Sequence, residues 1–545
     1  MKCTITSQRG MATFIALVMV AMLTMIGLAA LSTSDDEVKI SGNDLHETQA
    51  FYAAESGLQV ASAHLQKEYE ETGAPPLVMP EGNDSINSCS VKYGSVDAGP
   101  AEVRELTTGS LAGLHGLVKT FNLSSTAINA SQRAQVTLNE QFETALVPIF
   151  QFAVFYGNDL EIAPGADMTL VGRVHSNGNL WVQANSSLKM DSYVTASGKI
   201  LHGRKGPEPV SSGDVLIKDA TGAYASMKLG SGWLDANNAK WYDSSVARWD
   251  GRVKDSAHGQ GKLNLPLAPS AGGDPHKLIE RESGNPDSYE AKSTLKFIDG
   301  KAFRKVGGSW SDVTATFMTL GIMAVADNKF KDQRENKKVD VTELDIKKLQ
   351  DNGYAPSNGV IYFSDKTAGK DYPALRLKNG STLGSGLTIA SENPIYTVGD
   401  YNSVNKQPAS LMADAVTFLS SSWNDVYGDS SKSKRIAVAT KVNASYLTGN
   451  VNTTATTYNG GFENLPRFLE TWTGKNFTWS GSAVNLWNSK QAIGTWNGTY
   501  YNPPNRIWSY DVDLDDPNKL PPETPAVRVF QRTGWQQQDV GYAAN

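Results

Sequence analysis

The sequence predicts an α+β fold in which a long N-terminal α-helix, transmembrane in its first half, is followed by a mostly β ectodomain. The helix is predicted by 21 consecutive uncharged residues at positions 11–31. The β ectodomain is predicted by short runs of alternating apolar and polar residues, separated by Gly, Asn and Ser. Within it, a repeat of about 20 residues predicts parallel β-solenoid-like coils.

The apolar stretch at 11–31 is long enough to cross a membrane. As an α-helix it would be about 31 Å long, which matches the hydrocarbon core of a bilayer. Lys2 and Arg9 precede it, and an acidic run at 35–37 follows it. Positive charge before an apolar span places the N-terminus in the cytoplasm and the rest of the chain across the membrane.

Three interpretations of this stretch are open. A signal peptide would be cut after its apolar core, although Ala29-Ala30-Leu31 is a poor version of the small-residue cleavage site. A plain membrane anchor would not be cut. A cut before the stretch, between Gly10 and Met11, would leave the helix on the mature protein. The third is favoured because apolar residues recur at near-helical spacing through 36–65, as in a subunit that leaves a membrane to pack in a filament.

Residues 8–61 resemble the N-terminal helix of PilX-like type IV pilus minor pilins. The resemblance rests on Arg-Gly before the apolar span, on the span itself, on Ser41-Gly42-Asn43, and on the segment QAFYAAESGL at 49–58. It implies that a prepilin peptidase cuts after Gly10 and methylates the new N-terminus at Met11. From residue 159 to the C-terminus, the chain also resembles the extended C-terminal regions of large PilX-like proteins.

The fifth mature position departs from the pattern of major pilins. Those proteins carry a glutamate there, thought to pair with the terminal amine of a neighbouring subunit, whereas this chain has Ile15. Burying an amine without a partner is costly. The departure therefore favours a place at the tip of a filament over repeated interior positions.

Composition excludes some classes of function. The formal net charge is −6, and removal of Lys2 and Arg9 with the leader changes it to 48 − 56 = −8. An acidic chain without a basic run is a poor nucleic-acid binder. Cys3 lies in the predicted leader, so Cys89 is alone in the mature protein, which predicts a buried and inert thiol.

Patterning divides the chain into four parts. Glu, Gly and Pro residues at 66–85 predict a break after the helix, and alternating runs follow. The predicted parts are a prepilin leader (1–10), a pilin-like N-terminal helix (11–67, transmembrane at 11–31), a small β-rich pilin-like head (86–148) and a large β-rich domain (149–545). The last part holds the repeats at 159–198, a Trp-rich C-terminal part and a tail from residue 534 that we expect to be loose.

The repeats align without a gap when residues 159–178 are written over residues 179–198. Leu160 falls on Leu180 and Gly178 on Gly198, and Ile200 begins a third copy. Two coils alone would not be stable, so we expect further coils from the short strands predicted at 359–420. An antiparallel sandwich is the alternative. The segments 328–335 and 341–349 predict short helices, the second with a start signal at Thr342 and Asp345.

No constellation of residues predicts catalysis, a cofactor or a bound metal. The histidines lack zinc spacing, and His175 is predicted to be a turn or surface residue. Asp511, Asp513 and Asp515, followed by Asp516, could ligate calcium or form a solvated acidic turn, and the EF-hand glycine and late glutamate are absent from this segment. The seven C-terminal tryptophans could form a sugar-binding face, but a core role is favoured.

These observations favour a filament protein that is not an enzyme. The predicted function is a minor pilin, anchored in the inner membrane with a periplasmic ectodomain, then incorporated at or near the tip of an extracellular pilus. There it would prime assembly or present an adhesive β-rich domain. Predicted partners are minor and major pilins, prepilin peptidase, the inner membrane, and a tip adhesin or surface glycan, without nucleic acid. Alternatives are a type II secretion pseudopilin and a membrane-tethered carbohydrate-binding β-helix protein.

Overall fold

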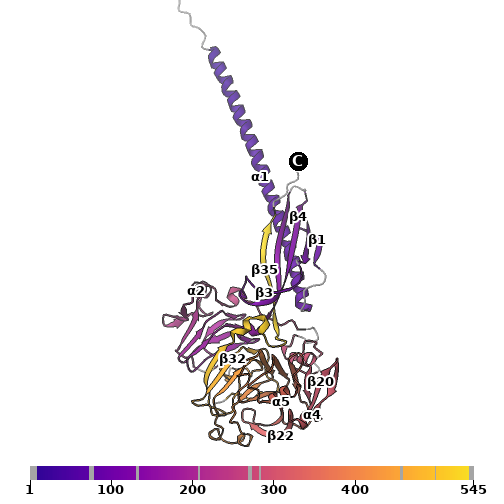
Figure 1. The fold of residues 1–545 in the computed structure, drawn as a ribbon. Helices are drawn as coiled ribbons and strands as arrows, with labels where there is room; N and C mark the ends of the chain where they lie inside the picture. The colour runs from indigo at the N-terminus through magenta and orange to yellow at the C-terminus, as the bar shows by residue number, and fades with distance from the viewer. Residues whose placement is uncertain are drawn as a thin grey trace, which may run out of the picture.

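The computed structural model describes residues 9–72, 79–97, 99–130, 134–206, 209–267, 273–281, 284–454, 458–496 and 499–538. Figure 1 shows a long N-terminal helix that projects from a small head, with a larger β-rich body beyond the other end of the head. The predicted α+β class, with a long apolar helix before a large β-rich region, is confirmed.

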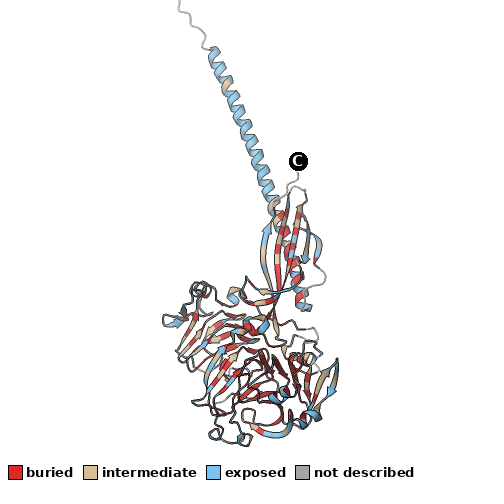
Figure 2. Cartoon of the chain, in the orientation of Figure 1, coloured by how far each residue is buried: buried red, intermediate tan, exposed pale blue. Residues whose placement is uncertain are grey.

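Helix α1 (Arg9–Thr72) is continuous through the apolar stretch and the amphipathic segment. No proline interrupts it, and it ends at Thr72 rather than at the predicted residue 67, just before the prolines at 75 and 76. Among the described residues, no other element contacts its first half, which is exposed on every side (Figure 2). Its second half is bound to the head.

Small residues let the second half of α1 approach the head closely. Ala50, Ala54 and Ala61 recur on one side of the helix and are fully buried, together with Leu58 and Leu65. They pack against apolar side chains of the head sheet in one common core. A face of alanines brings the helix axis close to the sheet, while the longer side chains fill the gaps that remain.

The head is an antiparallel sheet in the order β1-β2-β4-β5-β35, with β3 paired to β4. Apolar and polar residues alternate along β4, so one face covers α1 and the other meets solvent. The strands are β1 (Glu81–Ile86), β2 (Cys89–Asp97), β3 (Glu102–Glu105), β4 (His115–Asn129), β5 (Gln135–Pro148) and β35 (Ala526–Gln537).

The C-terminal strand belongs to the head, not to the large domain in which the sequence placed it. β35 pairs with β5 from Ala526 opposite Pro148 to Gln537 opposite Leu138. The tail expected to be loose from residue 534 is thus strand through Gln537, and residues 539–545 lie outside the described residues. The large body is therefore an insertion between two neighbouring strands of the head.

A long sheet runs through the body, and its pairings from β18 to β19 are parallel. Two antiparallel strands, β20 and β21, extend its end. In order, the strands are β18 (Val253–Lys254), β12 (Val194–Ala196), β9 (Arg173–Ser176), β6 (Phe152–Tyr156), β33 (Ala483–Asn485), β31 (Ser445–Thr448), β28 (Ala409–Ala413), β26 (Leu387–Ser391), β24 (Val360–Ser364), β19 (Leu295–Ile298), β20 (Lys301–Val306) and β21 (Ser309–Asp312).

Smaller sheets and short helices complete the body. The sheets are β13 (Ile200–His202), β10 (Leu180–Val182) and β7 (Leu160–Ile162); β15 (Tyr224–Ser226), β14 (Asp214–Lys218), β11 (Ser187–Met190) and β8 (Met168–Leu170); β16 (Lys228–Leu229) and β17 (Gly232–Trp233); β22 (Met323–Asp332), β23 (Lys337–Asp345), β25 (Tyr372–Lys378), β27 (Ile395–Val398) and β29 (Val416–Leu419); and β30 (Thr440–Asn443), β32 (Asn476–Gly481) and β34 (Asn505–Tyr510). The helices are α2 (Trp241–Trp249), α3 (Tyr289–Lys292), α4 (Thr314–Thr319) and α5 (Ile346–Asp351).

The strands of the 20-residue repeats pair in the register of the sequence alignment. Leu180 lies opposite Leu160 on one side and opposite Ile200 on the other, and all three side chains are fully buried. Asp159 Oδ1 accepts a hydrogen bond from the amide of Asn179 at 2.9 Å, and Asn179 Oδ1 accepts one from Lys199 at 2.8 Å. The same side-chain position thus joins each copy to the next.

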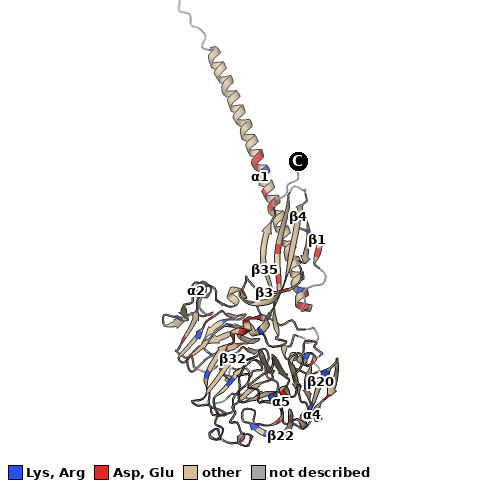
Figure 3. Ribbon diagram, in the orientation of Figure 1, with Lys and Arg blue, Asp and Glu red and all other residues tan. Residues whose placement is uncertain are grey.

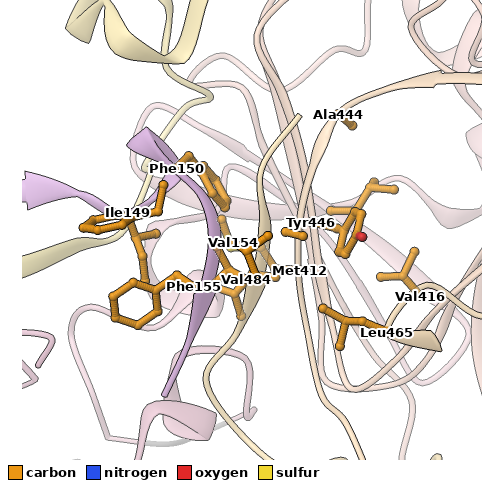
Figure 4. Close-up of a cluster of buried hydrophobic side chains, with 14 of the residues drawn as sticks. Ile149, Phe150, Val154, Phe155, Met412, Val416, Ala444, Tyr446, Leu465 and Val484 are labelled. Atoms are coloured by element: carbon orange, nitrogen blue, oxygen red, sulfur yellow. The ribbon is translucent and has the colours of Figure 1, made fainter. Parts of the chain in front are cut away.

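The strands predicted within 359–420 continue the parallel stacking, because β6 of the first block pairs with β33 of the second. Side chains along this junction belong to one core, and Phe155, Val154, Val484 and Met412 are among them (Figure 4). These parallel pairings contradict the antiparallel alternative for this sheet. The more specific interpretation of the stacked segments as a β-solenoid stays a prediction.

The short helices predicted at 328–335 and 341–349 are wrong over most of their length. Residues 328–332 lie in β22, and Val341 and Thr342 lie inside β23, where a run of buried residues pairs with β25. The start signal at Thr342 and Asp345 favoured a helix, but pairing and burial within a sheet override it. Asp345 is the actual N-cap, accepting a hydrogen bond from the amide of Lys348 at 3.0 Å, so helix α5 begins at Ile346.

The close approach of α1 predicts different effects for two glycines of the same helix. A Cβ at Gly57 would lie 2.3 Å from Ser125 Oγ and 2.7 Å from Val91 Cγ1, whereas one at Gly42 would have no atom within 4 Å. Gly57→Ala should therefore destabilise the head by about 1–3 kcal/mol, and Gly42→Ala should stabilise the helix by up to about 1 kcal/mol. Calorimetric melting in detergent would measure both. Equal effects would contradict the close packing.

Candidate functional site

The free half of α1 presents a long run of exposed apolar side chains. Most of the large apolar side chains from Met11 to Leu31, among them Phe14 and Leu23, are at least half exposed. The segment at 11–31 carries no charge, and acidic residues follow it along the helix from Asp35 (Figure 3). By length and composition the helix can span a membrane, with a mean hydropathy of 2.6 in its most apolar window. A surface of this kind needs a lipid or protein environment.

An apolar stripe extends this surface past the membrane-length segment. Val38, Leu45 and Tyr52 are spaced seven residues apart, which places them on one side of the helix. They are 68%, 57% and 56% exposed, while Ala53 and Ala54, next to Tyr52, are fully buried against the head. The stripe therefore faces away from the head and is free to meet another helix.

The predicted processing residues lie in the first turn of α1. The helix begins at Arg9, and Met11 is 69% exposed. Ile15, one turn later, is half exposed and belongs to the same uncharged surface. Residues 1–8 lie outside the described residues, and cleavage between Gly10 and Met11 stays a prediction.

Residues 9–59 match a family model described as PilX N-terminal. The chain is PilX-like in this segment. The match covers the free half of α1, its apolar stripe and the start of its contact with the head, and it confirms the resemblance predicted from the sequence. No curated protein matches the chain.

Among solved structures, the PilX-like chain is similar to the competence-associated pilin ComZ from Thermus thermophilus. The similarity covers 91% of this chain and 98% of that chain, with 12% sequence identity and a TM-score of 0.28. A TM-score of this size supports no conclusion about fold or function.

His175 is a buried structural residue, which corrects its prediction as a turn or surface histidine. It lies in β9, is fully buried, and its ring nitrogens lie 2.8 Å from Thr195 Oγ1 and 3.0 Å from Asn177 Oδ1. Burial lowers the pKa of His175 to about 4. Cys89 is a buried free thiol, as predicted, and burial raises its pKa.

Aspartates of the acidic segment near the C-terminus form ion pairs with two lysines. Lys406 Nζ lies 2.7 Å from Asp511 Oδ1 and 2.6 Å from Asp513 Oδ2, and Lys519 lies 2.9 Å from Asp513 Oδ1. Asp515 accepts a hydrogen bond from the Tyr510 hydroxyl at 2.7 Å. Within the described ranges, no group of three or more His, Cys, Asp or Glu side chains is placed to hold a metal ion.

Most of the C-terminal tryptophans contribute to the core, which is the role that the sequence favoured. Three are buried, three are partly buried against the core, and one is 49% exposed. In that order they are Trp472, Trp479 and Trp487; Trp423, Trp496 and Trp508; and Trp535.

A pair of buried carboxylates was missed by the sequence analysis. Glu161 in β7 and Glu463 in the short 3₁₀ turn Phe462–Asn464 are 7% and 5% exposed. Glu161 accepts a hydrogen bond from the amide of Lys205 at 3.0 Å, and Glu463 accepts one from the amide of Ala163 at 2.8 Å. Because Ala163 and Glu463 are 300 residues apart in the chain, no local pattern could reveal the pair.

Burial raises the pKa of both carboxyl groups, and that of Glu161 to about 7. Glu463 raises the pKa of Glu161 further, whereas the Lys205 amide, Tyr458 and Arg204 lower it. Since the carboxyl of Glu161 stays protonated in the fold at pH values where the unfolded chain would lose the proton, stability should fall as the pH rises from about 4.5 to about 7.

Glu161→Gln should remove this loss of stability, on the order of 3 kcal/mol, because the amide cannot ionise and still accepts the Lys205 hydrogen bond. The variant should unfold at a higher temperature than the parent at pH 8 and at about the same temperature at pH 4. Glu105→Gln, at an exposed position in β3, is the control and should show no such difference. If the difference in melting temperature between the parent and Glu161→Gln were the same at every pH in this range, the raised pKa of Glu161 would be contradicted.

Proposed function

We propose that this chain is a minor pilin of the type IV pilus. The observation that carries the proposal is the PilX-type segment on a helix whose first half is apolar, exposed and free of the head. Residues 11–49 would extend about 58 Å from the head, long enough to span a membrane and to reach beyond it. In the membrane the apolar half is solvated by lipid, and in a filament it packs against the helices of other pilins.

The proposal includes processing by prepilin peptidase after Gly10 and methylation of Met11. The ectodomain would lie in the periplasm before assembly and outside the cell afterwards. The resemblance of the first turn of α1 to prepilin processing sites supports the proposed cleavage. The positive charge before the apolar span supports the proposed orientation in the membrane. Prepilin peptidase and other pilins are the partners that this requires.

We also infer a position at or near the tip of the filament. The body is inserted at the end of the head away from the free helix (Figure 1). Copies of such a body repeated at every subunit would crowd each other. Ile15 supports the same position, because a buried terminal amine without an acidic partner is less costly where fewer subunits surround it. A tip subunit of this shape could prime assembly and present its body as an adhesive domain.

Leu45→Glu tests whether the stripe on α1 is an assembly surface. Leu45 is exposed and free of the head, so the variant should fold and reach the membrane normally. In the filament the glutamate would be buried, and the amount recovered with sheared pili should fall at least tenfold. The measurement is the ratio of protein in sheared pili to protein in membranes.

Leu229→Glu is the matched control, since Leu229 is an exposed leucine in the body, at 44% exposure. It should leave incorporation unchanged. If Leu45→Glu entered filaments as well as this control, the stripe would not be an assembly surface. Loss of incorporation on deletion of a type II secretion system, rather than of the pilus machinery, would instead assign the chain to a secretion pseudopilin.

A further inference from the structure

A cavity of about 430 Å³ opens beside the two buried carboxylates of the body. Glu463 lines it, and so do two arginines and three aromatic residues: Arg204, Arg506, Tyr458, Trp496 and Tyr501. Its size is within the range of small-ligand sites. The lining combines cations, amides and aromatic rings.

The two arginines have hydrogen-bonding capacity to spare. Within the described residues, Arg204 forms no hydrogen bond or ion pair, and its guanidinium lies over the Tyr458 ring, 4.9 Å from the centroid. Arg506 donates from Nη2 to the carbonyl of Glu463 at 3.1 Å, while its buried Nε has no partner among the described residues. A planar guanidinium held by an aromatic ring is suited to bind a carboxylate through two parallel hydrogen bonds.

The carboxylates nearby do little to neutralise these cations. Glu463 and Glu161 each accept a backbone hydrogen bond, and neither forms an ion pair with Arg204 or Arg506 in the described part of the chain. Burial disfavours their ionised forms. Two arginines and one carboxylate line the cavity, so its lining carries excess positive charge and favours an anionic ligand.

The remaining walls suit a sugar ring. Tyr458 and Trp496 meet edge to face with centroids 5.8 Å apart, and Asn464 accepts a hydrogen bond from the Tyr501 hydroxyl at 2.6 Å. Aromatic faces pack on the apolar faces of sugars, while amides bind hydroxyl groups. A polynucleotide would need a basic track to follow its phosphates, and the net charge of the chain is −6.

We propose that this cavity binds a uronic acid residue of a polysaccharide, with Arg204 holding the sugar carboxylate and the aromatic residues contacting the ring. The site gives the adhesive role a location and a class of target. The test of this site does not depend on filament assembly, because binding is measured on the isolated chain.

The test is calorimetric titration of the full-length chain in detergent with a galacturonate trisaccharide and with the neutral galactose trisaccharide. The acidic sugar should bind saturably and at least tenfold more tightly than the neutral one. Arg204→Gln should weaken binding of the acidic sugar at least tenfold, and Arg204→Lys should weaken it less, because it keeps the charge and loses the fork of donors.

Arg304→Gln is the matched control. Arg304 also lies over a tyrosine ring, 5.3 Å from the centroid of Tyr354, but neither residue lines the cavity. It should leave affinity unchanged. Equal binding of the two trisaccharides, no binding of the galacturonate, or no effect of Arg204→Gln in a variant that melts like the parent would overturn the proposal. Tighter binding of a single-stranded oligonucleotide at the same residues would also overturn it. Failure of the pilin proposal would show as loss of processing or incorporation, which these titrations do not measure.

Discussion

The pairing of β35 with β5 is the constraint on which the arrangement of the molecule depends. It closes the head sheet and places the two ends of the body side by side, where the amide of Ile149 donates to the carbonyl of Pro525 at 2.8 Å. Arg528 on the same strand donates to the carbonyls of Tyr69 and Glu70, at 2.9 and 2.6 Å, near the end of α1. One strand thus joins helix, head and body, so a pull on the helix is transmitted to the body through paired strands.

This arrangement separates two surfaces with different chemistry. At one end, α1 offers an uncharged segment at 11–31 and an apolar stripe, which suit lipid and then other helices. At the other end, the body buries most of its apolar residues in a continuous core of parallel strands. Its cavity is lined with arginines, aromatic rings and a buried carboxylate instead. Assembly and ligand binding can therefore change independently, with the head as the connection between them.

The sequence predicted those features that local patterns encode. An uninterrupted apolar run predicts α1, and the 20-residue alignment predicts the register of Leu160, Leu180 and Ile200 because each copy repeats the same burial. Prediction from the sequence failed where the secondary structure of a segment depends on strands that are far away in the chain. The tail from residue 534 was expected to be loose, but its first residues pair as the end of β35 with β5, which is far away in the chain. Helices were predicted at 328–335 and 341–349, where parts of β22 and β23 instead pair within a sheet whose other strands are distant in sequence. Of the candidate site, the helix could be predicted, but the Glu161–Glu463 pair could not.

The central claim is that α1 is a pilin assembly helix kept on the mature protein. N-terminal mass spectrometry of the protein purified from its native host tests it most directly. The account predicts a mature chain that starts at N-methylated Met11, with the whole apolar segment retained. A chain that still starts at Met1 would mean a static membrane anchor, and one that starts beyond Leu31 would mean an ordinary secreted protein; either result would contradict the account.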